Sequence, residues 1–183
     1  MAEPIKIENV VASASLNADI PLNKLLQLPG TEYEPEQFPG LVFRMNDPKA
    51  AALIFSSGKI VCTGARSPEL AKAAIDKVVQ NIKKLGIKVG KVIDVKVENI
   101  VASTKLDMEL KLNEIAFSLP NAEYEPEQFP GLVYRMEDPK VAFLLFGSGK
   151  VVCTGGKSIK DVEFAIKKVE KKLIRSNKSC VRR

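Results

Sequence analysis

The side chains that most often carry out enzyme chemistry are scarce in this sequence. Its 183 residues contain no histidine, only three cysteines, and 28 Lys+Arg against 22 Asp+Glu, which gives a formal net charge of +6. Without an imidazole the chain cannot form a Ser-His-Asp or Cys-His catalytic unit, a histidine proton shuttle or a zinc site that needs histidine. These classes of enzyme are excluded, and we expect no metal site and no cofactor.

The three cysteines, Cys62, Cys153 and Cys180, lie far apart in the sequence. They form neither a CxxC metal clip nor a redox pair, and an odd number does not suit a disulfide framework. The start, MAEPIKIENV, lacks the basic and apolar segments of a signal peptide. The longest apolar runs, at 50–55 and 141–146, are too short to span a membrane. We therefore expect a soluble protein in a reducing, intracellular setting.

The positive charge is concentrated at the C-terminal end of the chain. Residues 166–183 hold eight basic residues and one acid, which leaves 20 basic and 21 acidic residues in positions 1–165. The body of the chain is therefore nearly neutral. Net charge alone does not indicate nucleic-acid binding here, and the positions of individual side chains must decide.

A doubled sequence is the strongest pattern in the chain. EYEPEQFPGLVFRM at 32–45 recurs as EYEPEQFPGLVYRM at 123–136, with Phe43 against Tyr134 as the only difference. Two further pairs are similar: FSSGKIVCTGARS with FGSGKVVCTGGKS, and IENVVAS with VENIVAS. The first pair lies 91 residues apart and the second 90, so the second half contains one added residue, near 116–119. Two copies are too few for a solenoid. We predict a pseudo-twofold pair of units, 1–90 and 91–183, suited to a ligand with approximate twofold symmetry.

The periodicities within each unit predict strands and two helices. Ser67 is an N-cap before Pro68, with apolar residues then at helical spacing up to Gly86, and the copy begins at Ser158 with Asp161 placed for a capping box. Shorter helices are expected at 21–28 and about 111–118. Short β-branched segments predict strands at 5–13, 41–45, 51–55 and 59–63 and at their copies, and the Ser-Gly-Lys sequences predict hairpin turns.

The two-residue period of a strand gives each predicted sheet two different faces. One face is fully apolar, whereas the other mixes Val, Leu and Phe with Asn, Thr, Lys and Arg. Because two helices per unit can cover only one face of an antiparallel sheet, the mixed face is left for a partner. A closed sandwich of the two sheets or a dimer interface would also cover it, but a sandwich would bury charges without partners, at Arg44, Lys59, Arg135 and Lys150.

The DNA minor groove fits the mixed face better, because its sugars and base edges lie between two rows of phosphates. The doubled YEPEQFPGL, FxSGK(I/V)VCTG and ENxVAS sequences resemble those of the TATA-binding protein family, in its archaeal form, over essentially the whole chain. The resemblance implies an α+β fold, in which the repeats form a saddle of ten antiparallel strands with four helices on the convex side.

The resemblance also implies a function. Members are general transcription initiation factors rather than enzymes: they bind the TATA box in the minor groove, bend the DNA by inserting phenylalanines, and recruit transcription factor B and RNA polymerase. It implies a cytoplasmic, nucleoid-associated protein, and a homodimer through the saddle when the protein is free.

Site residues follow from the resemblance, position by position. The intercalating residues would be Phe38, Phe55, Phe129 and Phe146. Contacts to bases and the groove would come from Asn9, Val11, Pro39, Leu53, Val61, Thr63, Asn99, Val101, Pro130, Leu144, Val152 and Thr154. Phosphate contacts would come from Arg44, Ser57, Lys59, Arg66, Arg135, Ser148, Lys150 and Lys157. Taken singly, each of these residues could have an ordinary structural role instead. A Phe could belong to the core, an Asn or Thr could bond to the backbone, and a surface Lys could simply be solvated.

Acidic segments at 32–36 and 123–127 lie next to the expected wedges, where phosphate binding would favour basic residues. They are therefore expected to face a protein. The resemblance implies that transcription factor B docks on the second segment, through Glu125, Glu127 and Gln128. The basic C-terminal tail differs from the acidic ends of many archaeal members, and its role stays open.

Two other functions stay open on the sequence alone. The saddle could be a scaffold that binds only proteins, or a DNA-binding domain like the one that accompanies certain DNA-repair glycosylases. The second would need a following helix-hairpin-helix with a catalytic Lys and Asp, and we expect none because the sequence ends at Arg183.

Overall fold

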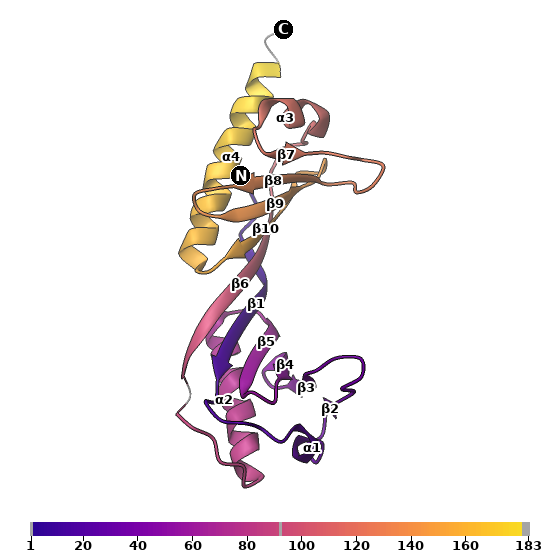
Figure 1. The fold of residues 1–183 in the computed structure, drawn as a ribbon. Helices are drawn as coiled ribbons and strands as arrows, with labels where there is room; N and C mark the ends of the chain where they lie inside the picture. The colour runs from indigo at the N-terminus through magenta and orange to yellow at the C-terminus, as the bar shows by residue number, and fades with distance from the viewer. Residues whose placement is uncertain (1, 92, 181–183) are drawn as a thin grey trace. The chain divides into compact units, whose positions relative to one another are not determined.

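The computed structural model describes residues 2–91 and 93–180, in which the same series of elements occurs twice (Figure 1). The first series is β1 (Lys6–Ser15), α1 (Leu22–Leu25), β2 (Thr31–Glu32), β3 (Leu41–Asn46), β4 (Lys49–Ile54), β5 (Lys59–Ala65) and α2 (Pro68–Lys84). The second is β6 (Ile93–Lys105), α3 (Leu112–Ser118), β7 (Ala122–Glu123), β8 (Leu132–Met136), β9 (Val141–Leu145), β10 (Lys150–Gly156) and α4 (Ile159–Cys180). The strands form one ten-stranded antiparallel sheet in the order β2-β3-β4-β5-β1-β6-β10-β9-β8-β7.

The chain divides into two compact units that exchange short strand segments. One unit comprises residues 9–98, and the other comprises the residues up to Glu8 together with those from Asn99 onward. In the second unit Glu3 N donates to the carbonyl of Lys105 at 2.8 Å, and Ser103 Oγ donates to Glu8 at 2.7 Å. These compact units do not coincide with the predicted units 1–90 and 91–183. The residues up to Glu8 lie with the second unit, and those between residue 91 and Glu98 lie with the first.

The two long helices begin at the predicted caps. Ser67 is extended and its Oγ accepts a bond from Leu70 N at 3.1 Å, while Pro68 occupies the first turn. Ser158 Oγ accepts from Asp161 N at the same distance. Each helix buries one apolar stripe against the strands of its own unit. The stripe is formed in α2 by Ala71, Ala74, Ile75, Val78 and Ile82 and in α4 by Val162, Ala165, Ile166, Val169 and Leu173.

The short helices differ from each other in length. The helix expected at 21–28 is wrong in extent, since α1 ends at Leu25. Leu26 N and Leu28 N bond to carbonyls three residues back, so the chain tightens into turns before Pro29. The second copy, α3, runs from Leu112 to Ser118 and is longer than α1. The residue that the second repeat was predicted to have added near 116–119 thus lies in the part of the chain where α3 extends further than α1.

The predicted strands are confirmed, and two short strands join them. Sequence periodicity missed β2 and β7 because a two-residue strand has no period, yet they pair with β3 and β8 at the sheet edges. The hairpin turns are present as predicted. Gly58 adopts a φ of +88°, and a side chain there would collide with the carbonyl oxygen of Ala18.

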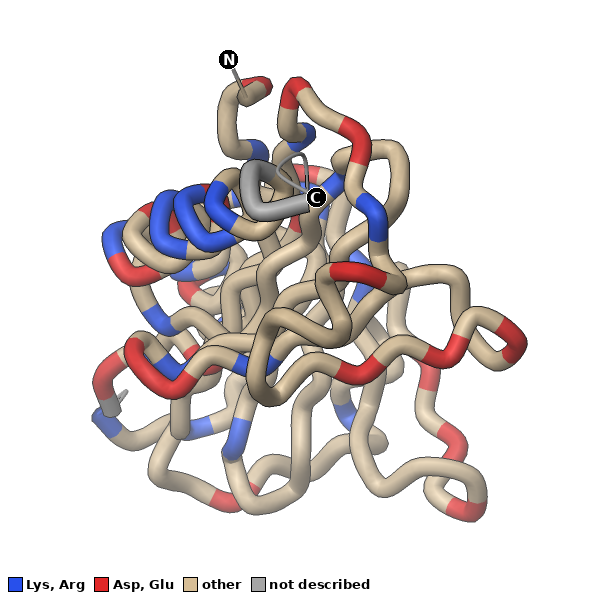
Figure 2. The backbone as a smooth tube through the Cα atoms, turned by 90° about the horizontal axis from the view of Figure 1, so that it is seen from above, with Lys and Arg blue, Asp and Glu red and all other residues tan. Residues whose placement is uncertain are grey.

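In each unit the two faces of the sheet differ as the strand period predicts. In β3, Leu41, Phe43 and Met45 are buried beneath the helices, whereas Val42 is half-buried and Arg44 is exposed on the other face. Figure 2 shows the positions of basic residues grouped along a helix and those of acidic residues on several loops. No helix in the described part of the chain is long and apolar enough to cross a membrane.

The described cysteines belong to the helix-covered cores. Cys62 in β5 and Cys153 in β10 are both buried free thiols. Burial raises the pKa of Cys62 to about 11 and that of Cys153 to about 12, because a thiolate there would lose its hydration. Among the described residues, no group of His, Cys, Asp and Glu is placed to hold a metal ion.

Candidate nucleic-acid interface

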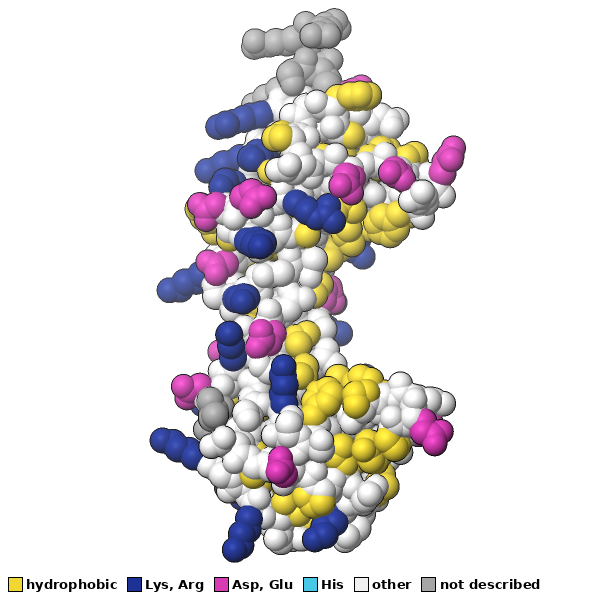
Figure 3. Space-filling model, in the orientation of Figure 1, with side chains coloured by type: hydrophobic (Ala, Val, Ile, Leu, Met, Phe, Trp, Pro, Cys, Tyr) yellow, Lys and Arg dark blue, Asp and Glu magenta, His cyan; other side chains and the backbone are white. Residues whose placement is uncertain are grey.

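The sheet face opposite the helices carries an apolar row that crosses the strands of each unit. Strand register places Val42 beside Leu53 and Leu53 beside Val61 in the first repeat. Val133, Leu144 and Val152 form the same row in the second. All six are half-buried, although each has buried neighbours along its strand. Figure 3 shows hydrophobic side chains grouped on this side of each unit. A row of this kind provides apolar surface for a ligand.

A second row carries polar side chains. Arg44 pairs with Ala51, and Ala51 with Thr63; in the other unit Arg135, Ala142 and Thr154 repeat the arrangement. The small alanine between the polar residues leaves the row open. In the second unit a cleft of about 300 Å³ lies over it, lined among others by Arg135, Ala142 and Thr154.

Each predicted Asn contact is bonded to the Thr of the polar row. Asn9 Nδ2 lies 3.2 Å from Thr63 Oγ1, while Asn9 Oδ1 accepts a bond from Gly64 N at 2.6 Å. Asn99 makes the same bonds to Thr154 and Gly155, at 3.2 and 2.7 Å. Because a backbone N–H can only donate, it fixes the amide oxygen inward and leaves the NH₂ group beside the threonine hydroxyl. The backbone bond expected as the alternative is thus present, and it orients the side chain.

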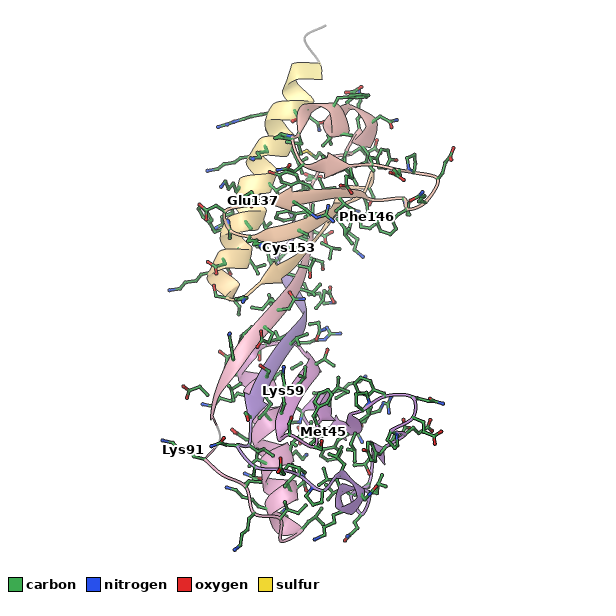
Figure 4. All side chains as sticks on the ribbon, viewed as in Figure 1. Met45, Lys59, Lys91, Glu137, Phe146 and Cys153 are labelled. Carbon is green, nitrogen blue, oxygen red and sulfur yellow. The ribbon has the colours of Figure 1, made fainter. Side chains whose placement is uncertain are left out.

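The four predicted wedges form two matching pairs, in which Phe38 and Phe129 lie on the loops before β3 and β8, and Phe55 and Phe146 directly follow β4 and β9. The rings of Phe38 and Phe55 meet edge to face with centroids 5.9 Å apart, and those of Phe129 and Phe146 do so at 6.0 Å. Phe38 and Phe129 keep 40% of their surface exposed. Phe146 lies on the side of its sheet away from α4 (Figure 4). An ordinary core phenylalanine would not remain so exposed.

Two glycines that were absent from the predicted site support these pairs. A Cβ on Gly40 would lie 2.8 Å from Phe38 Cε1 and 3.0 Å from Phe55 Cε1. On Gly131 it would lie 2.7 Å from Phe129 Cε1 and 3.1 Å from Phe146 Cε1. Both rings of each pair therefore pack directly on a glycine. The doubled Phe-Pro-Gly sequence was the signal that could have identified them.

Two of the three predicted arginines, Arg44 and Arg135, are paired with acids of the protein itself. Arg44 Nη1 lies 3.1 Å from Glu32 Oε2, and Arg135 Nη1 lies 3.6 Å from Glu123 Oε2. The glutamates come from β2 and β7, the strands that periodicity missed. All four side chains are largely exposed, so solvent screens each pair and weakens it.

The other predicted phosphate contacts lie at strand ends and turns. All six are exposed: Ser57, Lys59, Arg66, Ser148, Lys150 and Lys157. A cleft of about 320 Å³ in the second unit brings Ser148 and Lys150 together with Lys6 and Lys105, two lysines that were not among the predicted site residues. Only the sheet pairing reveals this group, because Lys6 is distant from the others in sequence.

The predicted protein-docking residues lie on the loop between β7 and β8, which projects from its unit (Figure 1). Glu125, Glu127 and Gln128 are all exposed. The backbone carbonyl of Glu125 accepts bonds from Gln128 N and Phe129 N, both at 3.0 Å. The loop is therefore closed by a turn that carries acids on its tip and the predicted wedge Phe129 at its end.

Comparison with known proteins identifies the family. The sequence model described as "Transcription factor TFIID (or TATA-binding protein, TBP)" matches residues 4–85 and again residues 94–175. The chain belongs to the TATA-binding protein family. The resemblance inferred from the doubled motifs is confirmed, and so is the α+β fold of ten antiparallel strands and four helices. The family is one of DNA-binding transcription factors.

Relatives match over almost their entire length. The TATA-box-binding protein of Archaeoglobus fulgidus is 54% identical, covering 92% of this chain and 94% of that protein. That of Picrophilus torridus is 55% identical, covering 93% and 95%. The solved structure of Methanococcus jannaschii TBP has a TM-score of 0.86 and 50% identity, and covers 93% of this chain and 98% of that one.

Proposed function

We propose that the two repeats, 1–90 and 91–183, bind the minor groove of an A·T-rich promoter element, the TATA box. Each repeat would bind through the sheet face opposite its helices, here called the open sheet face. The observation that carries this proposal is the repetition, in both units, of an exposed Phe pair on a glycine beside an apolar row. Family membership supports the same assignment. The apolar rows would cover the groove, including Val11 and Val101 near its centre, and the basic residues would contact phosphates on both sides.

The Phe pairs would bend the DNA by entering base steps. Unstacking a step costs about a few kcal/mol, and the widened groove then covers more apolar protein surface. TATA-binding proteins are themselves the known example of this mechanism, so it follows from family membership. Pro39 and Pro130, which follow Phe38 and Phe129, would restrict the backbone beside each wedge.

Sequence preference would come from the Asn–Thr pairs. The minor groove of A·T pairs offers only acceptors, whereas guanine adds an amino donor. The NH₂ groups of Asn9 and Asn99 can donate to these acceptors, but they cannot accept a hydrogen bond from the guanine amino group. The flexibility of TA steps would add a preference that needs no direct contact.

The β7–β8 loop would recruit the next factor. Glu125, Glu127 and Gln128 present an acidic, exposed tip, which suits transcription factor B, and through it RNA polymerase. Binding at promoters would place the protein at the nucleoid of an archaeal cytoplasm. In the absence of DNA, the same apolar faces would be available for a homodimer.

The test is DNA bending by a wedge variant. Phe129→Ala with Phe146→Ala should weaken binding to a TATA duplex and reduce bending, measured by energy transfer between dyes at the duplex ends. Phe117→Ala is the matched control, because Phe117 is 94% exposed but lies on α3. Unchanged bending in the double variant, or an equal loss in the control, would contradict the proposal, and a protein-only scaffold would then be the better account.

A further inference from the structure

The outward side of α4 carries a line of basic side chains with an aromatic ring among them. Lys160, Phe164, Lys167, Lys171 and Arg175, here called the α4 stripe, are all exposed, and Phe164 keeps 59% of its surface. Intervals of three and four residues place them on one side of the helix. Figure 3 shows basic side chains projecting in a series along α4.

The repeat relation provides an internal comparison for this stripe. The offset that aligns Ser67 with Ser158 places Glu69, Ala73, Asp76, Gln80 and Lys84 of α2 at the corresponding positions, and all five are exposed. The same helix face therefore carries two acids and one base in the first repeat but four bases and a phenylalanine in the second. The proposed DNA face, by contrast, keeps its residues in both repeats, as Arg44 with Arg135 and Thr63 with Thr154.

The helix that carries the stripe is held to its sheet by two further lysines. Lys168 Nζ donates to the carbonyl of Asp138 at 2.6 Å, and Lys172 Nζ donates to Tyr134 Oη at 2.9 Å. In the first repeat Lys77 makes the first bond, to Asp47, but Phe43 and Asn81 replace the second pair. The single difference in the doubled motif, Phe43 against Tyr134, is thus matched by a change on the helix. A fixed helix loses little conformational freedom when a partner binds.

We propose that the α4 stripe is a docking surface for a partner protein whose contacting segment is acidic and carries an apolar side chain that packs on Phe164. The basic side chains favour an acidic segment by charge complementarity. The ring of Phe164 favours a protein over a nucleic acid, because exposed aromatic residues bury apolar area at protein interfaces and make no favourable contact with a phosphate. Glu163 and Glu170 flank one side of the stripe on the helix, which favours a short segment over a continuous polyanion. The stripe lies opposite the open sheet face of its unit, so this proposal is independent of DNA binding.

The experiment uses the full chain and fluorescence anisotropy. The probe is a labelled synthetic peptide of four Glu-Leu-Glu-Glu repeats. Lys160→Glu, Lys167→Asp and Lys171→Gln together give α4 the residues that α2 carries, and should raise the Kd for the peptide by about tenfold or more, since several charge contacts are lost. Phe164→Ala alone, again the α2 residue, should weaken binding by about threefold or more.

Further variants separate the stripe from exposed lysines elsewhere on the protein and from misfolding. Lys72→Gln with Lys84→Gln removes two exposed lysines from α2 and should leave peptide binding unchanged. Circular dichroism and TATA-duplex binding should match the wild type in every variant. Equal peptide binding by the wild type and the triple variant would overturn the proposal. It would also be overturned if Phe164→Ala had no effect while a single-stranded oligonucleotide competed as well as the peptide, because the stripe would then bind any polyanion.

Discussion

Arg44 and Glu32 form an ion pair at the edge of the open sheet face, with 3.1 Å between Nη1 and Oε2, and Arg135 and Glu123 form its counterpart at 3.6 Å. If Arg44 and Arg135 contact phosphates as proposed, a DNA phosphate would have to compete with these carboxylates for the arginines. An exposed pair contributes about 0–1 kcal/mol, so the competition is one that a phosphate can win. On the proposed function, the two acids would therefore lower the affinity for DNA without preventing binding.

Removing one of these carboxylates should strengthen DNA binding. Glu123→Gln frees Arg135 and should lower the Kd for a TATA duplex by up to about fivefold, the equivalent of 1 kcal/mol. Glu114→Gln is the matched control, because Glu114 on α3 forms an ion pair with the preceding Lys111 at 3.7 Å. Weaker binding by Glu123→Gln would indicate that the glutamate holds Arg135 in its DNA-binding position.

Salt dependence should report the phosphate contacts directly. With about six contacts, log K should fall against log salt with a slope of about −5, and Arg135→Ala should reduce that slope by about one. The measurement is a series of Kd values at increasing salt for both proteins. A slope near zero in the wild type would exclude the basic residues of the open face as phosphate contacts.

A methyl group on Gly131 should displace the second Phe pair. Its Cβ would lie within 3.1 Å of both rings, and loss of their packed geometry should weaken TATA binding by about fivefold, near the 1 kcal/mol that an aromatic pair contributes. Gly147→Ala is the control, since a Cβ there would approach Leu110 O no closer than 3.7 Å, an ordinary contact distance. Circular dichroism checks folding. Equal DNA affinity in the two variants would show that the glycine does not position the wedges.

The buried thiols should make stability depend on pH in the alkaline range. The pKa values of Cys62 and Cys153 are raised from 9.0 to about 11 and about 12. Because the unfolded chain loses these protons first, the free energy of unfolding should fall as pH rises above about 9. Cys62→Ala with Cys153→Ala should reduce this fall, measured by urea denaturation between pH 8 and pH 10 in a Cys180→Ser background. An identical fall in the variant would assign the effect to other groups.

The near-identity of the two halves should let the protein bind a near-palindromic TATA box in both directions. Asn9 corresponds to Asn99, Phe38 to Phe129 and Arg44 to Arg135, so little free energy separates the two orientations. Transcription factor B should supply the polarity by docking on Glu125 and Glu127. Cleavage from a reagent tethered to one half should therefore be two-sided without that factor and one-sided with it.

Charge reversal tests the docking assignment. Glu125→Lys with Glu127→Lys should abolish the ternary complex while binary TATA binding stays close to normal, and Glu34→Lys with Glu36→Lys provides the same reversal in the first repeat as a control. A ternary complex that survives the Glu125 and Glu127 changes would contradict the assignment.

The doubled motifs and the strand period predicted most of the fold. The alternation in β3 separated Phe43 from Arg44 correctly, and Ser67 and Ser158 marked the starts of the long helices. Local patterns could not predict β2 and β7, because two residues carry no period and their pairing depends on contact with β3 and β8. Local patterns also failed to predict the length of α1, since turns before Pro29 replace the last part of the expected helix.

For the candidate site, residue types could be predicted but not their partners. The chain positions of Phe38 and Phe55 gave no information that Gly40 lies beneath both rings. The pairing of Arg44 with Glu32 depends on an edge strand that the sequence did not indicate. Lys6 joins Lys105 and Lys150 only because the start of the chain lies with the second repeat, an exchange that comparison of the two repeats cannot reveal.

The central claim is that the open sheet faces read A·T pairs from the minor groove, and inosine substitution tests it most directly. An I·C pair has the major-groove face of G·C but lacks the guanine amino group in the minor groove. Binding to a TATA duplex should fall strongly when central pairs become G·C and should recover when the same pairs become I·C. Equal loss with G·C and I·C would contradict minor-groove reading by Asn9, Asn99, Thr63 and Thr154.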